Sequence, residues 1–264
     1  MQDENGASVP QTIIWGLYVV VILAVFFFFL IFLVPLPTYR LVGHCFEVCV
    51  SLICVASSVY AYTKLSRRAI FLLAAFAFGG YALATTFWYL FSIAVGRSFV
   101  YISIAELGFL GFLLIFIAAI TVEFPLENTG VWWTISCIVI SLAIPLLVFW
   151  DTGTSQPVHD IILAVRFLLA GLLIAVSISH GVYKYSLLWT GICLRCIAGM
   201  LYGIRETIFT TYSIPLFSST PASQALSAYD FLSVIGPLVI LSFALIQLGL
   251  FQYILLSKSP PVAA

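Results

Sequence analysis

The stretch that decides the fold is Val19 to Val34, which reads VVVILAVFFFFLIFLV. Every one of its sixteen side chains is apolar, so an element built from it has no polar face. A membrane-spanning β-strand alternates apolar and polar residues, whereas a lipid-facing helix is apolar all round. The stretch therefore predicts a transmembrane helix.

The composition of the whole chain extends this prediction. Of its 264 residues, 63% are hydrophobic and 8% are charged, whereas about a quarter of the residues in soluble proteins carry charge. Ten Lys and Arg balance ten Asp and Glu, so we expect no nucleic-acid partner and no acidic disordered tract. The bilayer is therefore the expected main solvent and partner.

Apolar runs bounded by Pro, Gly and charged residues predict eight transmembrane helices. Their approximate ranges are 12 to 34, 43 to 62, 69 to 93, 99 to 121, 131 to 150, 159 to 180, 187 to 210 and 228 to 256. A helix of about 20 residues crosses the hydrocarbon core. Asp3 and Glu4 precede the first run instead of a basic segment, so we expect a retained helix and not a signal peptide. The expected fold class is an all-α integral membrane protein.

Loop charges predict the orientation, because cytoplasmic loops hold an excess of Lys and Arg. One set of loops holds five such residues, namely Lys64, Arg67, Arg68, Lys184 and Lys258. The loops on the other side hold only Arg40 and Arg97. We therefore expect a multi-pass protein of the cell membrane with both tails, residues 1–11 and 257–264, in the cytoplasm.

The two halves of the chain, residues 12–126 and 127–256, resemble each other. His44 and His159 each open the second span of a half after an outer loop that contains proline. Gly80 and Gly199 then follow in the third spans, 36 and 40 positions later. We expect two parallel four-helix repeats, which would bring corresponding residues together around an axis along the membrane normal.

Ionisable residues inside the predicted spans indicate a ligand site. Such a group costs about 2.5 to 3.5 kcal/mol at the centre of a membrane helix, so it normally faces the bundle interior and has a partner. We interpret one set, in the outer half, as the lining of a cavity open to the outside. The set is His44, Glu47, Glu106, His159, Asp160, Arg166, Arg205, Glu206 and Asp230.

A structural interpretation of the same charges stays open. Glu106 and Asp230 each follow a serine by three residues, as in the capping box of a helix. Arg166 could pair with Glu47 or Glu106 merely to neutralise both charges. Arg195 stands apart from the set, about two turns from the cytoplasmic end of its span.

His44 and His159 also have the chemistry of metal ligands. Two imidazoles suit a divalent transition metal, or a haem iron as a bis-imidazole pair. No HExxH or CxxCH spacing accompanies them. We therefore expect no cofactor, with haem or a metal at these two residues as the alternative. No phosphate-binding loop or nucleophile elbow is present in the sequence, so we expect no enzyme.

The run Val42-Gly-His44-Cys-Phe-Glu47, the basic turn Lys64 to Arg68 and the glycine-bearing third span resemble a known class. This class is the eight-helix membrane-associated sensor input domains, third type, of prokaryotic signalling proteins. The resemblance implies signal transduction and transfers only His44 and Glu47 as site residues. Thr86 to Tyr89 lacks the Asp-x-x-His element of that class, and these 264 residues include no kinase or cyclase output module.

Three functions follow from these observations, besides that of a structural subunit. The first is a sensory or ligand-binding module that transmits to a signalling partner or to subunits of a membrane complex, with homo-oligomers as an option. The alternative is a small-solute or ion transporter or channel, with helices bent or broken at Pro145 and Pro237 and Arg195 at an inner gate. The second alternative is a haem- or metal-binding redox subunit. A water path from Glu106 and Asp230 to Arg195 favours transport, whereas a cavity closed on the cytoplasmic side favours sensing.

Overall fold

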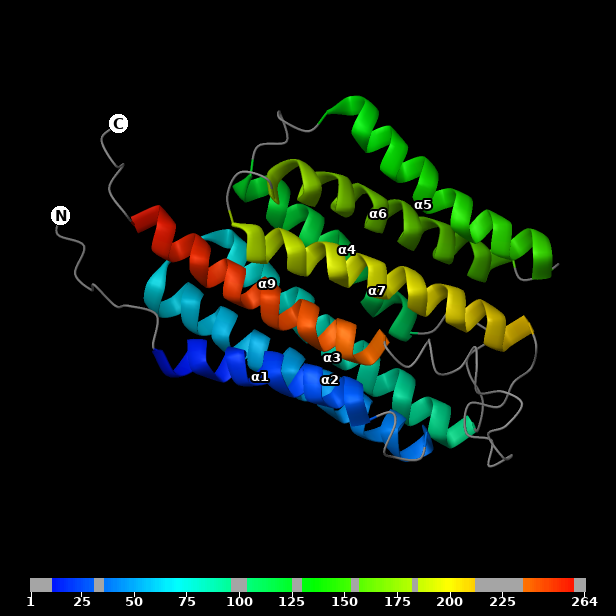
Figure 1. The fold of residues 1–264 in the computed structure, drawn as a ribbon, viewed down its shortest axis with the longest axis horizontal. Helices are drawn as coiled ribbons and strands as arrows, with labels where there is room; N and C mark the ends of the chain where they lie inside the picture. The colour runs from blue at the N-terminus through cyan, green and yellow to red at the C-terminus, as the bar shows by residue number, and fades with distance from the viewer. Residues whose placement is uncertain are drawn as a thin grey trace.

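The computed structural model describes residues 11–30, 36–95, 104–124, 130–152, 157–181, 185–211 and 235–258. These residues form eight α-helices and one π-helical turn, η1 (Figure 1). The elements are α1 (Gln11–Leu30), α2 (Leu36–Tyr60), η1 (Ala61–Leu65), α3 (Ala69–Val95), α4 (Ile104–Glu123), α5 (Val131–Thr152), α6 (Pro157–Gly181), α7 (Ser186–Thr211) and α9 (Ile235–Lys258). The expected all-α fold is confirmed.

Five helices contain described stretches that are long and apolar enough to cross a membrane. These stretches are Leu41–Leu65, Ala69–Phe91, Ile161–His180, Ser186–Ile204 and Ile235–Leu256. In α1, α4 and α5 the described apolar stretches span only 10–17 residues, so eight crossings stay a prediction. Length and composition thus indicate a membrane protein with several spans.

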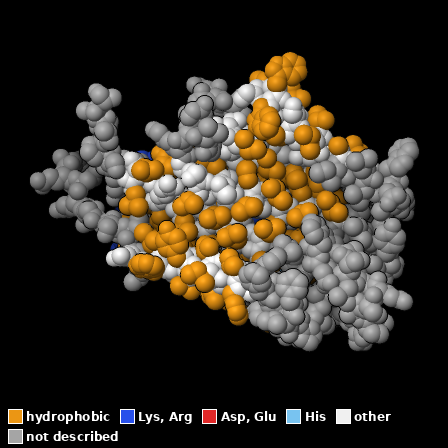
Figure 2. All heavy atoms as spheres, viewed as in Figure 1, with side chains coloured by type: hydrophobic (Ala, Val, Ile, Leu, Met, Phe, Trp, Pro, Cys, Tyr) orange, Lys and Arg blue, Asp and Glu red, His pale blue; other side chains and the backbone are white. Residues whose placement is uncertain are grey.

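The outer surface of the bundle is strongly apolar. Ile22, Phe76 and Leu83 expose 66%, 62% and 74% of their surface. Figure 2 shows apolar side chains over most of the described part of one face, with little charge among them. Soluble proteins rarely expose large continuous apolar patches. Lipid solvates such side chains, so this surface agrees with a bilayer environment.

Helix boundaries differ from the prediction where prolines occur. The second helix begins at Leu36, seven residues before the predicted 43, with Pro37 in its first turn. A proline there costs no hydrogen bond, because the first N–H groups of a helix have no acceptor within it. Pro237 lies likewise in the first turn of α9, and α5 continues through Pro145. Neither Pro145 nor Pro237 breaks its helix.

The central helices of the bundle are α3, α7 and α9. Helix α3 packs on α2 and α4, α7 packs on α6 and α9, and α9 also contacts α1 and α2. In Figure 1, α5 lies at one edge of the bundle beside α6, and α1 lies at the opposite edge. Contacts of α2 with α9 and of α4 with α6 join the two predicted repeats. The repeats and their boundaries stay a prediction.

Two glycines allow α7 and α9 to approach closely. A Cβ atom on Gly249 would lie 2.2 Å from the backbone nitrogen of Leu188. A Cβ atom on Gly191 would lie 2.6 Å from the backbone nitrogen of Ile246. Small residues are the usual means of close helix packing in membranes, where the hydrophobic effect no longer drives helix association. We therefore treat α7 and α9 as one packed pair.

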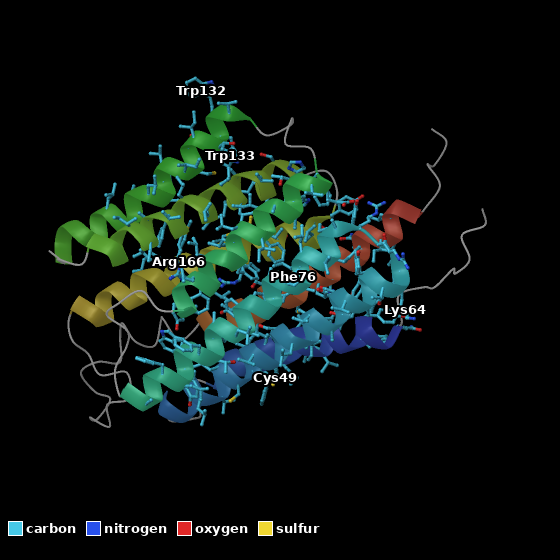
Figure 3. The ribbon with its side chains drawn as sticks, turned by 180° about the vertical axis from the view of Figure 1, so that it is seen from behind. Cys49, Lys64, Phe76, Trp132, Trp133 and Arg166 are labelled. Carbon is cyan, nitrogen blue, oxygen red and sulfur yellow. The ribbon has the colours of Figure 1, made fainter. Side chains whose placement is uncertain are left out.

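A polar cluster ties three elements together at one end of the bundle, which we call the Lys64 end after the labelled residue in Figure 3. Arg68 Nη1 donates to Glu123 Oε1 at 2.6 Å. The Tyr253 hydroxyl accepts a hydrogen bond from Arg68 and donates one to Glu123. Arg68, Glu123 and Tyr253, which we call the Arg68 cluster, thus join the turn before α3 to α4 and α9.

We expect Glu123→Gln to lower the free energy of unfolding by about 1 kcal/mol. A hydrogen bond to a charged group contributes about 1.5 to 3 kcal/mol, and solvent screening reduces that value here because the Arg68 side chain is 39% exposed. A double-mutant cycle with Arg68→Gln measures the coupling. Arg67→Gln, an exposed charge in the same turn, is the control. A coupling energy of zero would show that the cluster does not join these helices.

Candidate functional site

A pocket lies inside the bundle, lined by side chains of α2, α3, α4, α6, α7 and α9. Its volume of about 10 Å³ leaves room for one water-sized group. A second cavity shares Phe109, Arg166, Arg195 and Gly199 with it, so the two meet at the arginines. We call the combined space the Arg195 pocket. Its polar side chains include His44, Glu47, Tyr81, Thr85, Arg166 and Arg195.

Arg195 is the central charge of this pocket. Its side chain is only 6% exposed. Its guanidinium carbon lies 4.7 Å from the ring centre of Tyr81, 5.0 Å from that of Phe112 and 5.6 Å from that of Phe243. Its Nε is buried and has no hydrogen-bond partner among the described residues. The three rings stabilise the cation by cation–π contacts.

Glu47 is the one carboxylate among the described lining residues, and it is 5% exposed. Its Oε2 accepts a hydrogen bond of 3.3 Å from the Tyr81 hydroxyl. The ring of the same tyrosine packs against the guanidinium of Arg195. Tyr81 therefore connects the negative and the positive group of the pocket.

Arg166 brings a second guanidinium to the pocket. It is 7% exposed and lines both cavities, with its guanidinium carbon 5.5 Å from the ring centre of Phe109. In Figure 3 it lies in the half of the bundle away from Lys64. The described lining residues thus include two guanidinium groups and one carboxylate.

Aromatic rings surround His44 on the side of the pocket away from the Lys64 end. The imidazole centre lies 5.2 Å from the ring centres of Trp88 and Tyr89. Trp88 also contacts Tyr202, at 6.0 Å between ring centres, and it is 4% exposed. His44 is half-buried. These rings form an apolar wall beside the polar centre of the pocket.

A cluster of phenylalanines separates the pocket from the Lys64 end. Phe78, Phe112, Phe116 and Phe243 are at most 3% exposed. Their contacting rings lie 4.8 to 6.0 Å apart, within the usual range for packed aromatic pairs. Phe78, Phe116 and Phe243 lie closer to the Lys64 end than the pocket residues Tyr81, Leu113 and Val239 on the same helices. Along α3, α4 and α9, packed aromatic rings therefore lie between the pocket and that end.

The structure brings together His44, Glu47 and Arg166 of the predicted set. The helix backbone at Glu106, His159, Asp160, Arg205 and Glu206 is described, but their side chains lie outside the described part of the structure. Asp230 lies outside the described residues altogether. Approach of His44 to His159, and of Glu106 to Asp230, therefore stays a prediction. Within the described residues, no three His, Cys, Asp or Glu side chains group as metal ligands.

The interpretation that Arg195 stands apart is wrong, because it shares the pocket with Arg166 and Glu47. Arg166 and Arg195 each lie nine residues from the start of a helix of 25 or 26 residues. Because α6 and α7 run in opposite directions, this places the two residues within about 10 Å of each other along the bundle. Counting depth from both membrane faces would have revealed this proximity.

The sequence prediction does not include Tyr81 and Thr85, because it rests on charged and imidazole side chains and these two are neutral. They lie four residues apart in an otherwise apolar stretch of α3, so both fall on one face of the helix. Hydroxyl groups at this spacing are the signal that could have identified them. Both are buried and line the pocket.

The pocket thus combines two guanidinium groups, a carboxylate, a tyrosine hydroxyl and an imidazole with aromatic walls. Such a set can bind and orient a small polar molecule in a site shielded from water. Comparison with known proteins adds no relative, since the chain matches no family model, no curated protein and no solved structure.

Proposed function

We propose that this protein is a sensory membrane module that binds a small polar ligand in the Arg195 pocket and transmits the binding event to a partner protein. The observation that carries the proposal is the phenylalanine cluster, whose rings pack between the pocket and the Lys64 end on α3, α4 and α9. A transporter must open its site to both sides of the membrane. A site that ends in a packed core suits binding better than passage.

Helix α9 supplies the route for transmission. Arg195 packs on Phe243, which lies ten residues, or about 15 Å, before Tyr253 on the same helix. Tyr253 belongs to the Arg68 cluster at the Lys64 end. A ligand that moves the Arg195 guanidinium would therefore alter a contact that α9 connects to this end. The ligand shifts the equilibrium between two positions of α9 only to the extent that its affinities for these positions differ.

The Lys64 end is the proposed output surface. Lys64, Arg67 and Arg68 give it the positive charge typical of a cytoplasmic face. With eight spans in two parallel repeats, both tails would lie on this side of the cell membrane. A signalling protein or a subunit of a membrane complex would then read the arrangement of the Arg68 cluster.

The proposal predicts that binding in the pocket changes the Lys64 end. The full chain in detergent micelles is mixed with sodium acetate, sodium chloride, sodium phosphate, acetamide or methylammonium chloride. We expect one of these probes to change Trp88 fluorescence saturably, and to change hydrogen exchange in residues 61–68. Trp88→Phe identifies the fluorescence signal.

Glu123→Gln is the control for transmission. It should leave the fluorescence titration unchanged and remove the change in exchange, because it weakens the Arg68 cluster without touching the pocket. Fluorescence changes without any effect on residues 61–68 in the unmodified chain would contradict transmission. Counterflow of the bound probe in proteoliposomes would favour the transporter instead.

A further inference from the structure

The chemistry around Arg195 indicates the class of ligand, an inference that rests on the proposed function. We infer that the ligand is a small monocarboxylate, whose carboxylate group binds the guanidinium of Arg195. Charge, geometry and size support this assignment in turn.

The charge argument begins with the burial of Arg195. The Arg195 side chain is only 6% exposed, and no described residue accepts a hydrogen bond from its Nε. Burial of such a charge in a membrane interior costs free energy. Glu47, the one carboxylate among the described lining residues, accepts a hydrogen bond from Tyr81. An incoming anion would pair with Arg195 at low dielectric, where the attraction is stronger than in water.

The geometry argument concerns the edge of the guanidinium. Nε–H and the neighbouring Nη–H form two parallel donors, which match the two oxygens of a carboxylate. The Arg195 side chain contributes to the walls of both cavities. Gly199 lies beside the other nitrogen, since a Cβ atom on Gly199 would be 3.2 Å from Nη1. The glycine thus leaves the guanidinium room to align with a ligand.

Size and surroundings select a small monoanion. Each of the two cavities that form the pocket has room for about one water-sized group, so the pocket suits a ligand of only a few heavy atoms. Glu47, which accepts a hydrogen bond from Tyr81, would repel a second negative charge, which disfavours phosphate. The rings of Tyr81, Trp88 and Phe109, which line the pocket, offer an apolar surface to a short alkyl group. Chloride lacks the second acceptor atom that a carboxylate presents to the two donors.

Titration of the full chain in detergent tests the inference, with sodium acetate as the probe and Trp88 fluorescence as the signal. We expect acetate to saturate the site and acetamide and methylammonium to have no effect. Chloride and phosphate should bind at least about tenfold more weakly. Arg195→Gln should weaken acetate binding by about tenfold to a hundredfold, because it removes a charge-assisted pair of hydrogen bonds. Arg67→Gln removes the same charge at an exposed site and should leave the affinity unchanged.

Gly199→Ala provides a second variant that keeps the charge. Its new methyl group would contact Nη1 and shift the guanidinium, so we expect acetate affinity to fall several-fold. Gly80→Ala is the matched control, because a Cβ atom there has no neighbour within 4 Å. If Arg195→Gln does not fold, the difference in acetate affinity between Gly199→Ala and Gly80→Ala tests the inference; equal affinities would overturn it.

The outcomes separate this inference from the proposed function. Unchanged acetate affinity in folded Arg195→Gln, or saturable binding of acetamide or methylammonium in place of acetate, overturns the inference and leaves a sensory module intact. Acetate binding without a change in exchange at residues 61–68 supports the inference and overturns transmission. Absence of binding by every probe overturns both.

Discussion

Gly249→Ala should lower the free energy of unfolding by about 3 kcal/mol, the largest stability loss we expect from the addition of one methyl group. The new Cβ atom would lie 2.2 Å from the nitrogen and 2.4 Å from the Cα atom of Leu188. These are backbone atoms, which cannot rotate away as a side chain can. Extra methyl groups in a packed core typically cost about 1 to 3 kcal/mol, and more where the backbone must shift.

Thermal melting in detergent, followed by the fraction of protein that elutes as monodisperse particles, measures this loss. Gly111→Ala in α4 is the matched control, because a Cβ atom at Gly111 meets no atom within 4 Å. Alanine also favours a helix by about 1 kcal/mol over glycine, so the control should be neutral or slightly stabilising. Equal melting of Gly249→Ala and the unmodified protein would rule out the close approach of α7 and α9.

Phe243→Ala should lower the free energy of unfolding by about 3 kcal/mol or more. It should also leave space beside Tyr81 and Arg195. Phe243 is fully buried, with its ring centre 5.1 Å from that of Phe78 and 4.8 Å from that of Tyr81. Truncation of a buried phenylalanine leaves a cavity and removes many dispersion contacts. It also removes one of the three rings on Arg195.

Phe243→Leu is the control for this variant, since it keeps most of the volume and should cost less than about 1.5 kcal/mol. Melting measures the stability of both variants, and a chloride-sensitive dye inside proteoliposomes measures leakage. We expect leakage from Phe243→Ala alone, because only this variant opens the phenylalanine cluster. Equal stability and equal leakage of the two variants would show that the cluster is not the barrier.

Hydropathy predicted the helices well because lipid imposes a simple rule on the sequence. The predicted third span, 69 to 93, corresponds to α3 (Ala69–Val95), which is bounded by the basic turn at its start. The start of α2 was placed seven residues late, because Pro37 was interpreted as part of a loop. A proline within the first turn does not interrupt the helical hydrogen bonds, so its presence alone does not distinguish a loop from a helix start.

The pocket was predicted less well than the helices. The free-energy cost of a polar side chain inside a membrane span indicated His44, Glu47 and Arg166, because each is a charged or polar group in an apolar stretch. Arg195 and Tyr81 join them only through the order in which α3, α6, α7 and α9 pack. Helix order and rotation depend on contacts such as that of Gly249 with Leu188. Average hydropathy contains no information about such contacts.

Gly249, where α9 lies closest to α7, would be the pivot point of a tilt of α9. It lies six residues, or about 9 Å, after Phe243 and four residues, or about 6 Å, before Tyr253. A rigid helix that tilts about this point moves its two arms in opposite directions, and the shorter arm travels about two-thirds as far. An outward displacement of Phe243 by a ligand would therefore draw Tyr253 inward by a smaller amount.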